Sequence, residues 1–274
     1  MTHNRSIAFR NTDIHYKITG KGLPVVLVHG FAEDSDVWDR QVEFLKHNYL
    51  LIIPDLPGSG RSGIINDQKV GMEVYADCIR SILEAENINR CIMIGHSMGG
   101  YITLAFAEKY SESMAAFGLF HSSSYADDAA KIETRQKAID FIRKSGSEAF
   151  LKTSIPGLFY EQGNSGEADS LIEKGKAFAA EALIQYYEAM ITRPNRTAIL
   201  KKASVPILFI IGKHDKAVMP GHSLEQSHIP HRSHIHVLRN SAHMGMLEET
   251  DKANEILANF LESLSPNTNT RQHF

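Results

Sequence analysis

The stretch that decides the fold is Ile92-Met93-Ile94-Gly95-His96-Ser97-Met98-Gly99-Gly100. An apolar run of strand-favouring residues ends there in Gly-x-Ser-x-Gly, and a run with helical character, 101–110, follows at once. At such a strand-to-helix corner the backbone leaves no room for neighbouring side chains, which explains the glycine on each side of Ser97. The corner would push the Ser97 hydroxyl out of the sheet, beside unpaired backbone N–H groups that can hold an anionic oxygen. The stretch therefore predicts a nucleophile elbow.

The bulk composition excludes several classes of protein. With 274 residues, the chain can form one large α/β domain or two small ones. A net charge of −3 at pH 7 gives no electrostatic reason to expect nucleic acid or a membrane as a partner. The N-terminus lacks the apolar core of a signal peptide, and no apolar stretch is long enough to span a bilayer, so we expect a cytoplasmic protein. The two cysteines, Cys78 and Cys91, suggest buried free thiols rather than a disulfide framework or a metal site.

Strand-like and helix-like segments alternate over the first part of the chain. Two short runs, 6–10 and 13–18, are joined by Asn11-Thr12 and predict a hairpin at a sheet edge. The later strand runs are continuously apolar, which fits strands buried on both faces. This alternation predicts a doubly wound, mostly parallel sheet of about eight strands. The remaining predicted strands here are 25–28, 49–53, 90–94 and 115–120, and the predicted helices are 37–47, 71–86 and 101–110.

The pattern changes beyond residue 124, where helical stretches follow one another without a strand between them. A helical insertion inside an α/β pattern predicts a cap over the carboxyl edge of the sheet. We therefore divide the chain into a core (1–124 and 204–265), a helical cap (125–203) and a polar C-terminal tail (266–274) that we expect to be frayed. The predicted cap helices are 127–144, 147–154 and 167–191; the alternation then resumes with 205–211, 220–229, 233–238 and a final helix over 245–264.

Polar residues that can do chemistry follow the predicted strands. In an open parallel sheet, reacting groups gather outside the carboxyl ends of the strands. A nucleophile candidate, two carboxylates and several imidazoles occupy these places, which predicts a catalytic site at one edge of the sheet. The residues are His29-Gly30-Phe31, Asp55, Ser97, His121, Gly212-Lys213-His214-Asp215 and Ser241-Ala242-His243.

Ser97, Asp215 and His243 have the residue types and the chain order of a catalytic triad. A serine hydroxyl is a poor nucleophile at neutral pH and needs a base, which in turn needs a group that fixes its tautomer. His243 can be that base and Asp215 that orienting acid, in the order Ser, Asp, His. A developing oxyanion also needs donors, for which we predict the backbone N–H groups of Met98 and Phe31.

Together these motifs resemble those of the α/β-hydrolase fold family, and the resemblance covers residues 6–264. It implies the α/β-hydrolase fold, with the Asp55 loop as a structural turn beside the site, but it implies no particular substrate. Family members with an aspartate nucleophile, the haloalkane dehalogenases and epoxide hydrolases, are disfavoured because position 97 is serine. The dehalogenases also carry a halide-binding tryptophan where this chain has Met98. The motifs are His29-Gly30-Phe31, Pro54-Asp55-Leu56-Pro57-Gly58-Ser59-Gly60-Arg61-Ser62, Gly95-His96-Ser97-Met98-Gly99-Gly100, Gly212-Lys213-His214-Asp215 and Ser241-Ala242-His243.

Other residues are candidates for the substrate pocket. His96 directly precedes the serine and points away from its hydroxyl, so we expect it to pack under the corner rather than act as the base. Aromatic residues of the helical insertion should mostly form core, with a subset forming an apolar acyl- or aryl-binding wall. The pocket candidates are His29, His96, His121, Phe159 and Tyr186.

Two further patterns suggest sites that we consider weaker. Asp127 and Asp128 are possible alternative triad acids, but helix capping explains both. Of the 14 histidines, four lie close together in sequence, and His234 and His236 would share one face of a strand. No cysteine or carboxylate stands near them at a recognised spacing, so we expect no metal site. The four histidines are His228, His231, His234 and His236.

The sequence thus predicts a cofactor-free serine hydrolase that cleaves an ester of a small to medium apolar acid through an acyl-enzyme. Its expected partner is a small-molecule ester or acyl substrate. The same triad also serves C–C bond hydrolases, thioesterases, amidases and perhydrolases, and these alternatives stay open. A ligand receptor on the same scaffold is the non-enzymatic alternative, against which the complete set of catalytic residues argues. The oligomeric state and the physiological substrate stay open as well.

Overall fold

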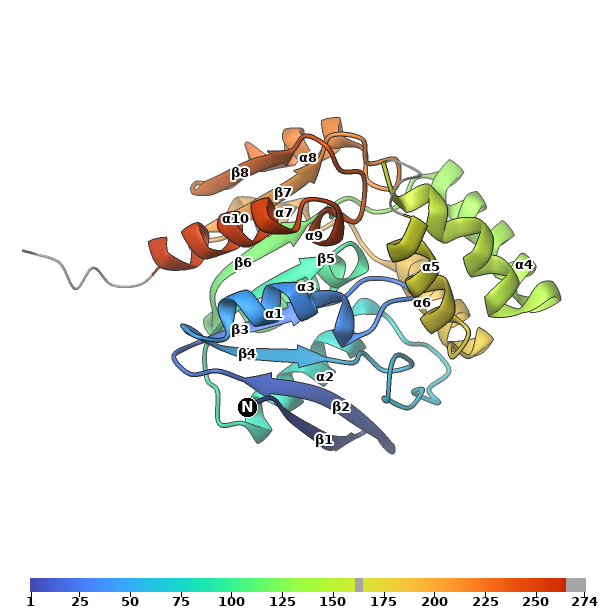
Figure 1. Cartoon of the computed structure of the whole chain (residues 1–274), viewed down its shortest axis with the longest axis horizontal. Coiled ribbons are helices and arrows are strands. Elements are labelled where there is room, and N and C mark those ends of the chain that lie inside the picture. The colour runs from blue at the N-terminus through green and yellow to red at the C-terminus, as the bar shows by residue number, and fades with distance from the viewer. Residues whose placement is uncertain (161–164, 265–274) are drawn as a thin grey trace, which may run out of the picture.

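The protein is built on one eight-stranded sheet, seen in a computed structural model that describes residues 1–160 and 165–264 (Figure 1). The strand order is β1-β2-β4-β3-β5-β6-β7-β8. β2 runs antiparallel to β1 and β4, and the other neighbours are parallel, which confirms the predicted fold class. The strands are β1 (His3–Phe9), β2 (Thr12–Thr19), β3 (Leu23–Val28), β4 (Tyr49–Pro54), β5 (Cys91–His96), β6 (Met114–Phe120), β7 (Ile207–Gly212) and β8 (Ser233–Leu238).

The central strands are apolar along their whole length because both faces of the sheet are covered. β3 lies between β4 and β5, parallel to both, and Val25 to Val28 are fully buried. A continuous run of β-branched and aliphatic residues is typical of such a strand. The position of β3 brings its carboxyl end next to that of β5, and hence the loop after Val28 next to Ser97.

Helices cover both faces of the sheet. α1 and α10 pack side by side on one face, and α2 and α3 pack together on the other (Figure 1). α2 is amphipathic, as its spacing predicts, and buries Tyr75, Ile79 and Leu83 among others. The core helices and 3₁₀ turns are η1 (Ser35–Trp38), α1 (Asp39–Leu45), α2 (Met72–Ala85), α3 (Met98–Lys109), η2 (Ser111–Ser113), α8 (Pro220–Ser227), α9 (Gly245–Glu248) and α10 (Thr250–Ser263).

A group of helices is inserted between β6 and β7 and forms a cap. In Figure 1 the helices α4, α5 and α6 lie beyond the arrowheads of the parallel strands, over the carboxyl edge where the polar residues gather. The cap elements are α4 (Ala129–Ser154), η3 (Ile155–Leu158), α5 (Ser165–Gly175) and α6 (Ala180–Thr192), and α7 (Thr197–Lys202), which follows them, contacts α3 of the core. The polar tail predicted for 266–274 lies outside the described residues.

One predicted break between helices is confirmed, and other predicted helices differ from the observed ones. The helices predicted over 127–144 and 147–154 correspond to the two parts of α4, which are separated at the non-helical Gly146, where φ is 84°. The single helix predicted over 167–191 is two, because α5 ends at Gly175 and Phe178 packs into the core before α6 begins. The final predicted helix is likewise interrupted at Glu249.

The edge hairpin and the first helix also differ slightly from the prediction. Arg10 and Asn11 form the turn between β1 and β2, with φ values of 46° and 62°, so the turn lies one residue earlier than Asn11-Thr12. The helix predicted over 37–47 starts as the 3₁₀ turn η1, capped by Asp34, whose carboxylate accepts from the Asp36 N–H.

Two further observations bear on the sequence predictions. Cys78 and Cys91 are buried and free, as predicted, and burial raises the pKa of the Cys91 thiol to about 12. Across 1–160 and 165–264, the helices are all too short or too polar to cross a bilayer.

The central strand should contribute more to stability than the open edge of the sheet. Leu27→Ala in β3 removes a fully buried side chain and should cost about 3 kcal/mol of unfolding free energy. Ile235→Ala in β8, where the side chain is 37% exposed, should cost less than about 1 kcal/mol. Urea unfolding followed by the fluorescence of Trp38, the single tryptophan, measures both. An equal loss of unfolding free energy in the two variants would contradict a larger contribution from β3 than from β8.

Candidate active site

Ser97 lies at a tight corner between β5 and α3. Its backbone has φ 50° and ψ −115°, a conformation that costs energy in a non-glycine residue, and its N–H donates to the Phe120 carbonyl over 2.9 Å. A Cβ atom on Gly95 would lie 2.2 Å from the Gly99 carbonyl oxygen, and one on Gly99 would lie 2.3 Å from that of Val28. Both flanking positions therefore require glycine, and the corner exposes the Ser97 hydroxyl above the sheet.

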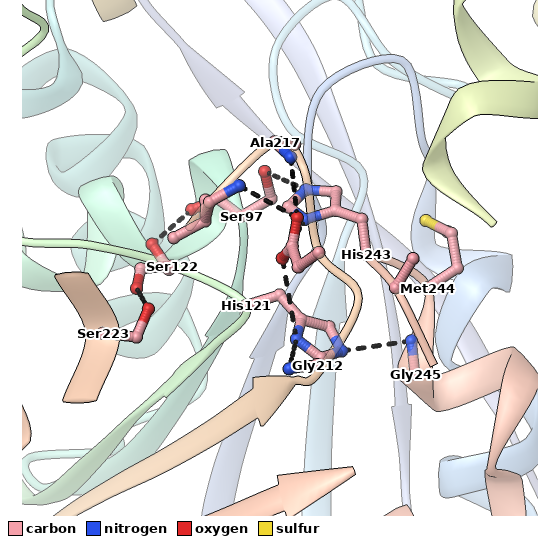
Figure 2. Close-up of polar contacts among 12 residues, drawn as sticks. Ser97, His121, Ser122, Gly212, Ala217, Ser223, His243, Met244 and Gly245 are labelled. Atoms are coloured by element: carbon pink, nitrogen blue, oxygen red, sulfur yellow. Dashed lines mark hydrogen bonds and ion pairs between the residues drawn. The ribbon is translucent and has the colours of Figure 1, made fainter. Parts of the chain in front are cut away.

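The structure brings Ser97, His243 and Asp215 into one hydrogen-bonded chain. The Ser97 Oγ lies 2.8 Å from His243 Nε2 (Figure 2), and His243 Nδ1 lies 2.8 Å from Asp215 Oδ2. Asp215 follows β7, and its Oδ1 accepts from the backbone N–H groups of Ala217 and Val218 over 2.8 and 2.9 Å. These last two bonds fix the carboxylate, so it can orient the imidazole.

The charge of Asp215 is held by its partners. Burial alone would raise the pKa of this carboxyl, but the His243 imidazole and its hydrogen bond lower it to about 2. Asp215 is therefore ionised at neutral pH. An ionised acceptor at Nδ1 keeps a proton on that nitrogen, which leaves the lone pair of Nε2 facing the Ser97 hydroxyl.

The two predicted oxyanion donors lie near this chain. Phe31 follows β3 and lines the same cavity as Ser97. Met98 is the first residue of α3, where a backbone N–H has no acceptor within the helix. Neither N–H donates to a protein acceptor in the part of the chain that the structure describes. Both are therefore free to bind an oxygen atom of a ligand.

Glu33 is a buried site residue that the sequence analysis missed. Its carboxylate accepts from the Gly30 N–H over 2.7 Å and lies 3.0 Å from His96 Nδ1. His96 Nε2 in turn lies 2.9 Å from the backbone carbonyl of His243. Glu33 and His96 thus connect the loop of Phe31 to the loop of His243, beneath the serine. His96 packs under the corner, as expected, and does not act on the Ser97 hydroxyl.

Glu33 and His96 form a buried ion pair. Burial alone would raise the pKa of Glu33, yet the His96 charge and hydrogen bond lower it below its usual range. Burial would also lower the pKa of His96, and Glu33 raises it above its usual range. Both ring N–H groups of a charged His96 have an acceptor, which agrees with these directions. In the sequence, nothing separates Glu33 from its capping neighbours Asp34, Ser35 and Asp36.

A cavity of about 810 Å³ opens above the Ser97 hydroxyl, between the sheet edge and the cap. Ser97 and His243 both line it. Part of its wall is apolar, with Phe31, Tyr187 and Met190 among the lining residues, and another part carries the cations Lys131, Arg135 and Arg193. A ligand in this cavity would meet the nucleophile candidate and its base together.

None of the five predicted pocket residues lines the cavity, and we correct that prediction. The position of a residue after a strand does not reveal which side of the loop its side chain takes. His29 Nε2 accepts from the Leu56 N–H over 3.0 Å and thus fixes the following loop instead. The Tyr186 hydroxyl donates to the Pro57 carbonyl over 2.7 Å. Its neighbour Tyr187 reaches the cavity because successive helical residues point in different directions.

The three other pocket candidates are also occupied elsewhere. His96 is paired with Glu33, and Phe159 packs into the hydrophobic core. His121 is fully buried among the loops that follow β7 and β8, where its ring nitrogens face the backbone N–H groups of Gly212 and Gly245.

The two acidic residues at the start of the cap have different roles. Asp128 caps α4, since its carboxylate accepts from the Lys131 N–H over 2.8 Å, as predicted. Asp127 does not cap the helix, and that prediction was wrong. Its buried carboxylate lies 2.6 Å from Arg135 Nε and 2.9 Å from Arg193 Nη2. Asp127 therefore joins the beginning of the cap to its end and is not available as a triad acid.

The histidines near the C-terminal strand do not gather around a common point. The His234 ring packs edge-on against Phe260, with 5.1 Å between ring centroids. Among the described residues, the histidine, cysteine and acidic side chains form no group of three that could hold a metal ion.

The buried pair makes a prediction about stability. The lowered pKa of Glu33 and the raised pKa of His96 both favour the charged forms of the pair. His96→Gln leaves the Glu33 carboxylate buried without its cation, and should lower the unfolding free energy by about 3–5 kcal/mol. The double variant Glu33→Gln/His96→Gln buries no charge, so its unfolding free energy should fall by less than that of His96→Gln. Urea unfolding at pH 7 compares the three proteins, and a double variant less stable than His96→Gln would contradict the ion pair.

Comparison with known proteins agrees with this architecture. The family model described as the alpha/beta hydrolase fold matches residues 24–141. A non-heme chloroperoxidase from Streptomyces lividans is 30% identical over 229 residues, which cover 76% of this chain and 80% of that protein. A 2-hydroxy-6-oxo-6-phenylhexa-2,4-dienoate hydrolase from Comamonas testosteroni is 23% identical over 90% of this chain and 91% of its own length.

Solved structures show the same likeness over nearly the whole chain. A thermophilic esterase from Thermogutta terrifontis superposes with a TM-score of 0.88 at 26% identity, covering 96% of this chain and 100% of that one. The identity to the Streptomyces lividans protein, the family model and the sheet order agree. The chain therefore belongs to the alpha/beta hydrolase fold family.

Proposed function

We propose that this hydrolase cleaves carboxylic esters with Ser97 as nucleophile, His243 as general base and Asp215 as the orienting acid. The observation that carries the proposal is the continuous chain of 2.8 Å contacts from Ser97 through His243 to Asp215, with Ser97 on the wall of the cavity. Contacts of this length let a proton move from the hydroxyl to the imidazole without rearrangement. The proposed reaction uses no cofactor.

In the first half of the reaction, Ser97 Oγ attacks the carbonyl carbon of the ester while its proton passes to His243 Nε2. The carbonyl oxygen becomes an oxyanion, which the N–H groups of Phe31 and Met98 would bind. The negative charge of Asp215 stabilises the imidazolium that forms. The tetrahedral intermediate then collapses, the bond to the alcohol oxygen breaks, and the alcohol leaves with the proton from His243.

In the second half, water enters and attacks the acyl-enzyme. His243 takes one proton from the water, and the same two amides would hold the second oxyanion. Collapse of this intermediate releases the carboxylic acid and returns the proton to Ser97 Oγ. The enzyme is then in its starting state.

The cavity supports an acid part of small to medium size with apolar character. Its volume of about 810 Å³ is within the usual range for small-molecule sites. The Phe31 and Tyr187 rings lie 4.3 Å apart between centroids, and Leu158, Met190 and Val218 also line the wall. Such a surface can bury an acyl or aryl group next to the Ser97 hydroxyl.

The comparisons support ester cleavage and also include relatives with other reactions. The Thermogutta terrifontis protein, at 26% identity, is an esterase, and the Streptomyces lividans relative, at 30% identity, is a non-heme chloroperoxidase. The Comamonas testosteroni relative is instead a hydrolase of 2-hydroxy-6-oxo-6-phenylhexa-2,4-dienoate. Both substrates can be tested on one preparation, so a substrate panel that includes short-chain esters and that dienoate separates the two activities.

A fluorophosphonate should label Ser97 stoichiometrically, because it traps an activated serine. Peptide mapping should find the adduct on Ser97, and Ser97→Ala should neither be labelled nor hydrolyse p-nitrophenyl butyrate. Ser81→Ala, on α2 away from the site, serves as the control and should behave as the wild type. An adduct on another serine, or hydrolysis by Ser97→Ala, would contradict the proposed nucleophile.

The rate of ester hydrolysis should rise with pH, since only unprotonated His243 can accept the Ser97 proton. We expect kcat for p-nitrophenyl butyrate to increase with pH and then level off. Asp215, with a pKa of about 2, stays ionised near neutral pH and should not shape the profile there. A rate that does not change through neutrality would rule out a histidine base.

A further inference from the structure

His121 is a buried histidine that the proposed reaction does not use. It directly follows β6, its side chain is 1% exposed, and its backbone has a φ of 49°. Residues other than glycine adopt this left-handed conformation rarely, and only when their surroundings hold them there. His121 does not line the cavity, so it does not reach a substrate. An effect on the reaction would have to pass through neighbouring residues.

The ring of His121 lies between the two loops that carry the proposed acid and base (Figure 2). Its Nδ1 is 2.9 Å from the backbone nitrogen of Gly212, which ends β7 just before the loop of Asp215. Its Nε2 is 3.1 Å from the backbone nitrogen of Gly245, which begins α9 just after His243. One side chain thus contacts both loops next to the reacting groups.

Each loop contacts the His121 ring at a glycine, where a side chain would not fit. A Cβ atom on Gly212 would lie 2.9 Å from His121 Cε1 and 1.8 Å from the Ala242 carbonyl oxygen. A Cβ atom on Gly245 would lie 2.5 Å from His121 Nε2. A side chain at either glycine would displace the His121 ring, so these glycines allow one imidazole to contact both loops. The loops are also joined directly, since the His214 N–H donates to the Ser241 carbonyl over 3.0 Å.

The surroundings of His121 require an uncharged ring. Both nitrogens face backbone N–H groups, and a neutral ring can accept from one of them, whereas a second ring proton would leave the ring with no acceptor at all. The titratable groups around it are Asp215, with 3.9 Å between Oδ2 and Nδ1, and the rings of His243 and His96, at 5.9 and 6.1 Å between centroids. Burial lowers the pKa of His121 well below its usual range, and the attraction of Asp215 does not offset it.

We propose that His121 is a positioning residue that, together with the backbone hydrogen bond between the two loops, holds Asp215 and His243 at their separation. It does so by accepting a backbone hydrogen bond at one ring nitrogen and by filling the space to the opposite loop. The inference rests on the proposed function, because this separation matters only where the two residues act together. A misplacement of about 1 Å in such a pair can cost on the order of 100-fold in rate.

Two variants separate the two parts of this role. His121→Leu removes every acceptor, whereas His121→Asn keeps a carbonyl oxygen near the place of Nδ1 and suits the left-handed backbone. The readouts are kcat and KM for p-nitrophenyl butyrate and the melting temperature. His236→Asn, a half-buried histidine of β8 outside the triad loops, is the control and should keep wild-type values.

The Leu variant should have a kcat about 30- to 100-fold below wild type, with KM within about threefold of wild type. The Asn variant should have a kcat at least about fivefold higher than that of the Leu variant. A Leu variant within twofold of wild type, an Asn variant without recovery, or a loss that appears in KM would each overturn the proposal. If the Leu variant does not fold, the Asn variant decides, since kcat should be about three- to tenfold below wild type at unchanged KM.

Ser97→Ala in the same assay separates this inference from the proposed function. If Ser97→Ala retains activity, the proposed function fails. If Ser97→Ala is inactive while His121→Leu keeps the wild-type kcat, the proposed function stands and the positioning role of His121 fails.

Discussion

The structure depends on the close approach of backbone to backbone beneath Ser97. The carbonyl oxygens of Val28 and Gly99 occupy the space that side chains would need at Gly99 and Gly95. This contact fixes the end of β3 against the start of α3. As a result, the predicted oxyanion donor on the loop after Val28 and the Ser97 hydroxyl are held by the same packing, and the strained conformation of Ser97 is kept by its surroundings.

The acid and the base are fixed by other means. Glu33 and His96 hold the His243 loop from one side by a buried ion pair, and His121 contacts it from the other through an uncharged ring. One of these histidines has a raised pKa and the other a lowered one, although both are fully buried. Burial lowers the pKa of both rings. Glu33, 3.0 Å from His96, reverses that effect, whereas Asp215, 3.9 Å from His121, does not.

The sequence predicted the fold and the meeting of Ser97, Asp215 and His243, because both follow from local pattern. Runs of buried residues define the strands, and sheet topology brings their carboxyl ends together. The pocket could not be predicted in the same way. Whether Tyr186 or Tyr187 reaches the cavity depends on the rotation of α6 against the core, which tertiary packing sets. Glu33 was missed for a similar reason, since its partner His96 lies far away in sequence.

The ion pairs of Asp127 have a consequence for how such a protein can change. Arg193, at the end of α6, meets Asp127, at the entry to α4, so the cap leaves the core close to where it enters. Residues can therefore be added or removed within the cap while its entry and exit stay where they are. The cap also contacts the core directly, since the His243 N–H donates to the Leu158 carbonyl over 2.9 Å, so a change in the cap reaches the loop of the proposed base.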